Sequence, residues 1–132
     1  MAKNYSVMNV GTFGKDLEAA GRIMAEKELG LTGCELSFNC SAPEQFLPFV
    51  HAHKDNEEVY IVLSGKGKFM ADGEEFEVKE GSVVRVAPLV GRAIKAEGGK
   101  LTYICIQASA GSLKQATMDD ATVCEEKASW MK

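Results

Sequence analysis

The pattern of apolar and polar positions near the start of the chain is helical. Residues Asp16 to Leu29 are mostly good helix formers, their apolar residues recur at helical spacing, and Gly30 follows them. Glycine directly after such a segment is a common helix terminator. The pattern therefore predicts one short N-terminal helix, although Gly21 interrupts it.

The segment Cys34 to Cys40 alternates between apolar and polar residues. Its cysteines, leucine and phenylalanine fall on one side, whereas Glu35, Ser37 and Asn39 fall on the other. A period of two is typical of a β-strand with two different faces. We expect the polar side to face solvent, and the alternative is that it helps to line a cavity.

From Glu58 onward the chain consists of short apolar segments separated by turn dipeptides, of which Asp72-Gly73 is the strongest hairpin signal. The expected strands are Val59–Leu63, Gly67–Ala71, Glu75–Val78, Val83–Val86, Arg92–Ala96 and Leu101–Gln107. Short strands at this even spacing, without helices between them, are typical of an antiparallel sandwich or barrel. The sequence therefore predicts an all-β fold.

Composition narrows the classes of function. The 132 residues suffice for one domain, which we take to span residues 1–132, and the tail from Ser112 to Lys132 shows no clear period. A net charge of -4 without a basic cluster argues against nucleic acid and membrane surfaces as partners. We expect a cytoplasmic protein, because the chain has no apolar segment of membrane-spanning length and its start lacks an apolar signal core. Four cysteines without a CxxC pair predict reduced, mostly buried thiols.

The two histidines of the chain, His51 and His53, lie two positions apart. On an extended backbone this spacing points both imidazoles to one face, and the carboxylates of Glu57 and Glu58 follow after four or five residues. Two imidazoles and a carboxylate suit Zn, Mn, Fe, Ni or Cu and leave coordination positions open. The alternative is a solvated polar loop without a metal.

The run HAHKDNEEVYIVLSG resembles the first motif of the cupin superfamily, which is HxH, four residues, Glu, six residues and Gly. The matching residues are His51, His53, Glu58 and Gly65. The resemblance selects Glu58 rather than Glu57 as the acidic ligand, because six residues separate Glu58 from Gly65, whereas seven separate Glu57 from it. It implies a divalent metal on His51, His53 and Glu58.

The run GSVVRVAPLVGRAIKA resembles the second cupin motif, with Gly81, a strand and Pro88, but Arg92 stands where that motif has a histidine. The resemblance covers about residues 31–107 and is to the small conserved-barrel cupins of the cupin 2 type. It implies a double-stranded β-helix, or jelly-roll barrel, with the short helix before it, commonly forming homodimers. Because arginine stays protonated, Arg92 cannot bind a cation.

Two interpretations of Arg92 stay open: its guanidinium binds a carboxylate or phosphate of a ligand, or it pairs with Glu58 at the position of the metal. Tyr60 shares the parity of Glu58, so it should line the interior and could contact a ligand. On the opposite parity, Val59, Ile61 and Leu63 need cover, which predicts a homodimer unless the N-terminal segment covers them.

The leading functional hypothesis is a metal-dependent isomerase or oxygenase that acts on a small polar or anionic metabolite. In it, the metal provides open coordination positions and Arg92 neutralises an anionic group. Two alternatives belong to other classes. One is a barrel that binds a small molecule without reaction, and the other is a structural cupin in which Arg92 pairs with Glu58 and no metal is bound.

Overall fold

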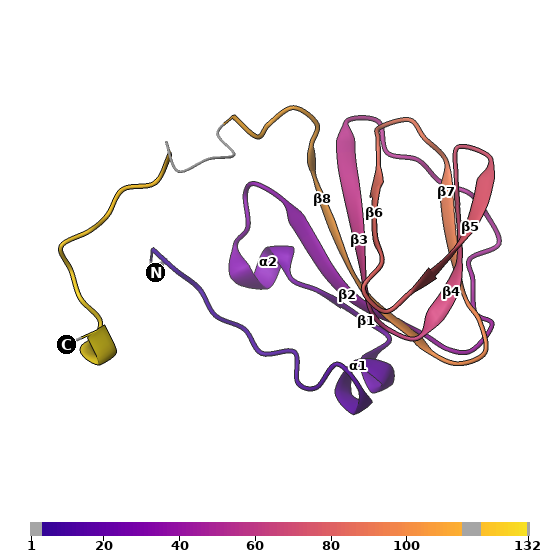
Figure 1. Ribbon diagram of the computed structural model, residues 1–132, viewed down its shortest axis with the longest axis horizontal. Helices are drawn as coiled ribbons and strands as arrows, with labels where there is room; N and C mark the ends of the chain where they lie inside the picture. Colours follow the sequence, from indigo (N-terminus) through magenta and orange to yellow (C-terminus); the bar gives the residue numbers. More distant parts are fainter. Residues whose placement is uncertain (1–3, 115–119, 132) are drawn as a thin grey trace.

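The computed structural model describes residues 4–114 and 120–131. Figure 1 shows two facing β-sheets, with two short helices and an edge strand beside them. The elements before the first long strand are α1 (Lys15–Ala20), β1 (Arg22–Met24) and α2 (Glu26–Leu29). The long strands are β2 (Glu35–Ser41), β3 (Asn56–Ser64), β4 (Lys66–Ala71), β5 (Glu74–Lys79), β6 (Val83–Val86), β7 (Arg92–Ala96) and β8 (Leu101–Ser109).

All seven strands expected from the sequence are present, with bounds that agree to within three residues. One sheet has the order β1-β2-β8-β3-β6 and the other has the order β5-β4-β7, and every strand pair is antiparallel. Asp72 and Gly73 both have positive φ in the turn between β4 and β5, as a tight hairpin requires. The predicted all-β jelly-roll architecture is confirmed.

The prediction of one helix over Asp16–Leu29 is wrong in its middle. Gly21 adopts φ 76° and its N–H donates to the carbonyl of Leu17, at 2.8 Å, which ends α1. The next three residues then pair with β2 as an edge strand, and Gly30 ends α2 in the left-handed conformation as expected. The hydrogen bonds that β2 offers at its edge therefore outweigh the helix propensity of Arg22–Met24.

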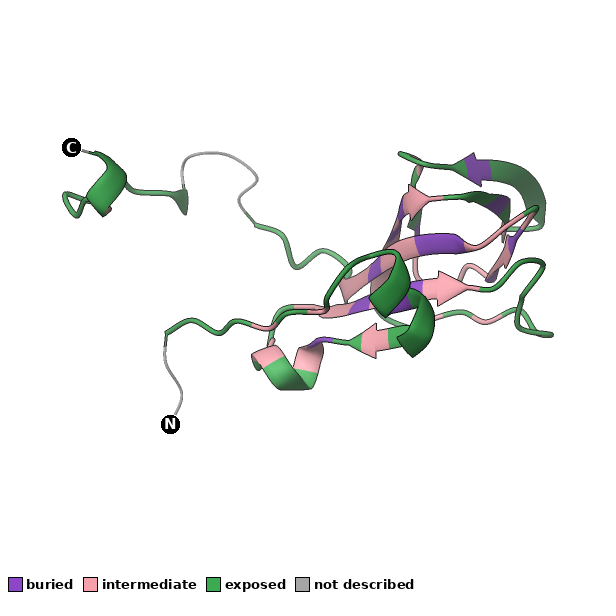
Figure 2. Cartoon of the chain, turned by 90° about the horizontal axis from the view of Figure 1, so that it is seen from below, coloured by how far each residue is buried: buried purple, intermediate pink, exposed green. Residues whose placement is uncertain are grey.

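The core lies between the two sheets, where the purple segments of Figure 2 mark buried residues. It contains eight buried side chains, all from strands β3 to β8: Tyr60, Val62, Phe69, Val78, Val86, Ala96, Leu101 and Cys105. Tyr60 and Phe69 meet across the interior as an edge-to-face pair with ring centroids 4.9 Å apart. This packing connects β3 of the larger sheet with β4 of the smaller one.

The polar side of β2 faces inward, so the expectation that it faces solvent is wrong. Ser37 and Asn39 are only 4% and 5% exposed. The opposite side of β2 lies against α1 and the segment before it, where Phe13 stacks on Phe38 at 5.8 Å and Leu17 is fully buried. Because the N-terminal segment covers the apolar side of β2, the polar side is the one left for the interior.

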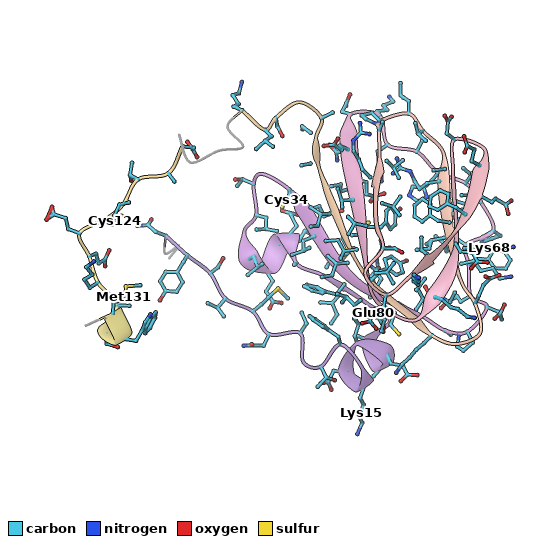
Figure 3. The ribbon with its side chains drawn as sticks, in the orientation of Figure 1. Lys15, Cys34, Lys68, Glu80, Cys124 and Met131 are labelled. Carbon is cyan, nitrogen blue, oxygen red and sulfur yellow. The ribbon has the colours of Figure 1, made fainter. Side chains whose placement is uncertain are left out.

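The C-terminal part of the chain contains the 3-10 turn η2 (Ser129–Met131). Almost all of residues 120–131 are exposed, and Figure 3 shows Cys124 well away from the two sheets. Residues 115–119 and 132 of the tail lie outside the described residues. The four cysteines carry free thiols, but only Cys105 is buried. Within the described ranges no helix is long and apolar enough to cross a bilayer.

Candidate functional site

The two histidines reach the interior because the loop before β3 runs along β7. His51 and Arg92 form a two-way backbone bridge, with N–H to O distances of 3.3 and 2.9 Å. The carbonyl of His53 accepts a hydrogen bond of 2.7 Å from the backbone of Leu89. These contacts fix the HxH segment as an extended edge of the smaller sheet, and they place Arg92 directly beside it.

Glu58 comes from the opposite wall, near the start of β3, between Val86 of β6 and Gln107 of β8. It is 3% exposed, whereas His51 and His53 are half-buried at the edge of the cavity. The ligand atoms of these three residues all lie within 4.8 Å of one another. The structure therefore brings together the three residues that the first motif selects.

The three side chains fit a divalent metal in donor type. Two ligands of one metal ion, each about 2.1 Å from it, lie about 3.0–3.4 Å apart. Nε2 of His53 and Oε2 of Glu58 are 3.7 Å apart, close to this spacing. The other pairs of ligand atoms lie farther apart, up to 4.8 Å, and must move closer to bind one ion. The partly exposed imidazoles of His51 and His53 can make this movement. His51, His53 and Glu58 would hold the ion, which would supply Lewis-acid chemistry to a bound oxygen atom.

The carboxylate of Glu58 already has three protein donors. Its Oε1 accepts from Nη1 of Arg92 at 2.7 Å and from the hydroxyl of Tyr60 at 2.8 Å. Its Oε2 accepts from the thiol of Cys105 at 3.0 Å and faces His53. A carboxylate has about four acceptor positions, so Oε2 keeps one for a metal while Oε1 has none to spare. Any metal must therefore share this carboxylate with Arg92.

Arg92 is completely buried, and its guanidinium is held at three points. Besides Glu58, its Nε donates to the carbonyl of Val90 at 3.1 Å and its Nη2 to that of Ala87 at 3.3 Å. The structure thus shows the pairing of Arg92 with Glu58, and Arg92 is not among the residues that line the cavity. Its contact with a ligand stays a prediction.

Burial sets the protonation of the surrounding groups. It lowers the pKa of His51, with Glu58 opposing and the positive charges of Arg92 and Arg22 adding to the lowering. It raises the pKa of Tyr60 and that of Cys105, and the contact with Glu58 raises both further. At neutral pH His51 is therefore a neutral imidazole able to bind a metal, and Tyr60 and Cys105 keep the protons that they donate to Glu58.

A cavity of about 440 Å³ opens beside these residues, large enough for a small metabolite. Its apolar wall includes Phe46, Phe49 and Ile94 from the loop before β3 and from β7. The opposite wall is polar and belongs to the larger sheet. Its members there include Arg22, Asn39, Tyr60, Tyr103, Cys105 and Gln107. A ligand would thus lie between an apolar wall and a polar one, with the two histidines and Glu58 at one side.

Sequence reasoning missed four of these polar residues. Cys105 and Gln107 share the inward parity of β8, and a count of alternating positions along that strand finds them. Asn39 requires knowing which side of β2 is covered, and Arg22 requires knowing that β1 is a strand. Tyr60 was expected to line the interior and does so, although its hydroxyl already donates to Glu58.

Comparison with known proteins places this arrangement in a family. The model of the family described as "Cupin domain" matches residues 41–107, half of the chain. The chain belongs to the cupin superfamily. A cupin protein of known structure from Bacteroides fragilis is 40% identical, with the alignment covering 93% of this chain and 99% of that one and a TM-score of 0.83.

Two more distant similarities are informative. A predicted oxalate decarboxylase from Thermotoga maritima is 21% identical over 57% of this chain and 65% of that one, with a TM-score of 0.54, and shares the fold. An uncharacterized protein from Methanocaldococcus jannaschii is 41% identical over 39 residues. That match spans 30% of this chain and about a third of the relative's length.

Proposed function

We propose that this cupin binds one divalent metal ion and a small polar or anionic metabolite in its cavity, as a metal-dependent isomerase or oxygenase. The observation that supports this is the convergence of His51, His53 and Glu58 within 4.8 Å at the wall of the cavity. A neutral His51 favours metal binding at physiological pH. The metal is Zn, Mn, Fe, Ni or Cu by donor type.

Metal content of the purified protein tests this proposal. Protein produced without an affinity tag should contain close to one equivalent of a transition metal by elemental analysis, together with any small molecule that remains bound. Chelator-treated protein should take up Zn, Mn or Ni in calorimetric titrations, and His53→Ala should bind at least about tenfold more weakly. Absence of metal in the purified protein and absence of binding in the titrations would reject the metal site.

A second candidate is a barrel that binds its ligand without metal. The observation that favours it is the buried ion pair between Arg92 and Glu58, since Arg92 supplies the positive charge that a metal would otherwise bring to this carboxylate. In this case elemental analysis finds no metal, whereas mass spectrometry of the purified protein finds a bound small molecule. The cytoplasmic location remains a prediction for both candidates.

We also propose that the protein is a homodimer through the outer face of the larger sheet. Val59 and Ile61 are half-buried there, and Val83, the register partner of Ile61, is 65% exposed. Val83→Lys should convert a dimer to monomer in light scattering at micromolar concentration. The control is Val123→Lys, which makes the same substitution at a valine that is 97% exposed in the C-terminal tail. A monomeric wild-type protein would refute the dimer.

A further inference from the structure

Among the described residues that line the cavity, one positive side chain has no ion-pair partner. Four charged residues line it, of which Glu18 pairs with Lys100 at 3.1 Å and Glu58 pairs with Arg92 at 2.7 Å. The fourth is Arg22, for which no ion pair is found among residues 4–114 and 120–131. The paired charges cancel, so Arg22 sets the sign of the cavity.

The fold aims this side chain inward. The Cα of Arg22 on β1 is opposite that of Asn39 on β2, which in turn is opposite Tyr103 on β8. Residues directly opposite each other in antiparallel strands share one face of the sheet. Asn39 and Tyr103 are on the cavity side, so the side chain of Arg22 is there too, and all three line the cavity.

Arg22 and Glu58 come from strands of the larger sheet that are not neighbours. β1 is three strands from β3 in the larger sheet, which carries Glu58. Three steps of about 4.8 Å give about 14 Å between the backbones of these strands along the sheet. A ligand with two polar ends can contact Arg22 with one end and the histidine side of the cavity with the other.

We propose that Arg22 binds the anionic group of the cavity's ligand, and that this ligand is a small metabolite with a carboxylate or phosphate at the end away from His51 and His53. Arginine suits this role because its planar guanidinium presents two parallel donors to such an oxyanion. Arg92 cannot bind a ligand anion while its hydrogen bonds all go to groups of the protein. We therefore assign the binding of the anion to Arg22 instead. Gly21 is essential to it, since it ends α1 and lets the next residue enter the sheet.

This inference rests on the proposed function only in requiring that the cavity binds a ligand. The test uses the full chain and three probes: succinate, glycerol 3-phosphate and uncharged glycerol. Affinities are measured by calorimetry or by NMR shifts for metal-free and metal-loaded protein. The variants are Arg22→Gln, Arg22→Lys and Arg85→Gln. Arg85 is the matched control because it pairs with Glu57 on the exposed outer side of the larger sheet.

The expected result is binding of at least one anionic probe to wild type, weakened about tenfold or more by Arg22→Gln. Arg22→Lys should retain part of the affinity, Arg85→Gln should leave it unchanged, and glycerol should not distinguish the variants. The preferred anion then identifies the ligand as a carboxylate or a phosphate. A urea midpoint for Arg22→Gln close to that of wild type shows that the variant is folded.

Three results would overturn the inference: neither anion binds wild type at millimolar concentration, Arg22→Gln binds as well as wild type, or Arg85→Gln weakens binding equally. Metal titration of the same proteins separates this failure from that of the proposed function. A protein that binds metal but loses no anion affinity in Arg22→Gln retains the metal site and refutes the role of Arg22. A protein that binds no metal but loses anion affinity in Arg22→Gln supports the role of Arg22 and refutes the metal site.

Discussion

Replacing Arg92 by methionine tests whether the buried ion pair holds the two walls of the cavity together. Arg92 is fully buried and Glu58 is 3% exposed, so the variant leaves a carboxylate inside the protein without its cation. It also removes the donors to the carbonyls of Val90 and Ala87. Methionine is flexible and apolar, so it fills most of the vacated volume and limits the effect of packing.

Breaking a buried ion pair by removing one partner costs about 3–5 kcal/mol. Losing donors to two partly buried carbonyls adds up to about 1 kcal/mol each, and the donors that remain on Glu58, from Tyr60 and Cys105, offset part of this. We therefore expect Arg92→Met to lower the free energy of unfolding by about 3–5 kcal/mol. A chain of this size is stable by roughly 7–20 kcal/mol, so the variant should still fold.

Urea unfolding in the presence of a chelator measures this loss, since no metal can then replace the missing charge. With a slope of about 2 kcal/mol per molar urea, the midpoint should fall by about 2 M. The matched control is Arg85→Met, which breaks the exposed Arg85–Glu57 pair at 2.6 Å and should cost less than about 1 kcal/mol. Adding Glu58→Gln to Arg92→Met should recover at least about 1 kcal/mol, because it removes the unpaired charge.

Two results would refute this reasoning. If Arg92→Met is no less stable than Arg85→Met, the buried pair is not a stabilising contact. If Glu58→Gln recovers nothing in the Arg92→Met background, the loss comes from packing rather than from an uncompensated carboxylate.

Three further predictions concern the site. Arg92→His should raise the affinity for Zn, Mn or Ni by about tenfold or more, because it removes a cation beside the metal position and adds an imidazole; unchanged or weaker binding by calorimetry argues against that position. Because burial lowers the pKa of His51, the NMR titration of its imidazole in metal-free protein should have a midpoint below pH 6.5; a midpoint above pH 6.5 contradicts this. Iodoacetamide should modify exposed Cys124 first and buried Cys105, whose pKa is raised, only on unfolding, as mass spectrometry of the peptides can check; early labelling of Cys105 would mean that the interior opens.

The sequence by itself determined the fold and the three residues that converge. Strand positions follow from alternation and turn dipeptides, because a period of two and a glycine with positive φ are local properties of the chain. The HxH spacing likewise puts His51 and His53 on one face, and the motif fixes Glu58 as the acid that meets them. Local rules suffice for the strand positions and for the shared face of His51 and His53, because neighbours in sequence set them, whereas the choice of Glu58 came from the resemblance to the cupin motif.

Only the tertiary structure decided which polar groups enter the cavity and which ones pair. Alternation divides β2 into two faces but does not say which one is covered, and the packing of Phe13 and Leu17 turned Asn39 inward. Arg92 pairs with Glu58 across 34 positions of sequence because both are buried together. Arg22 reaches the cavity because the free edge of β2 offers hydrogen bonds that a short helix cannot match. In each case the deciding energy comes from burial or pairing between distant segments, which local sequence rules do not contain.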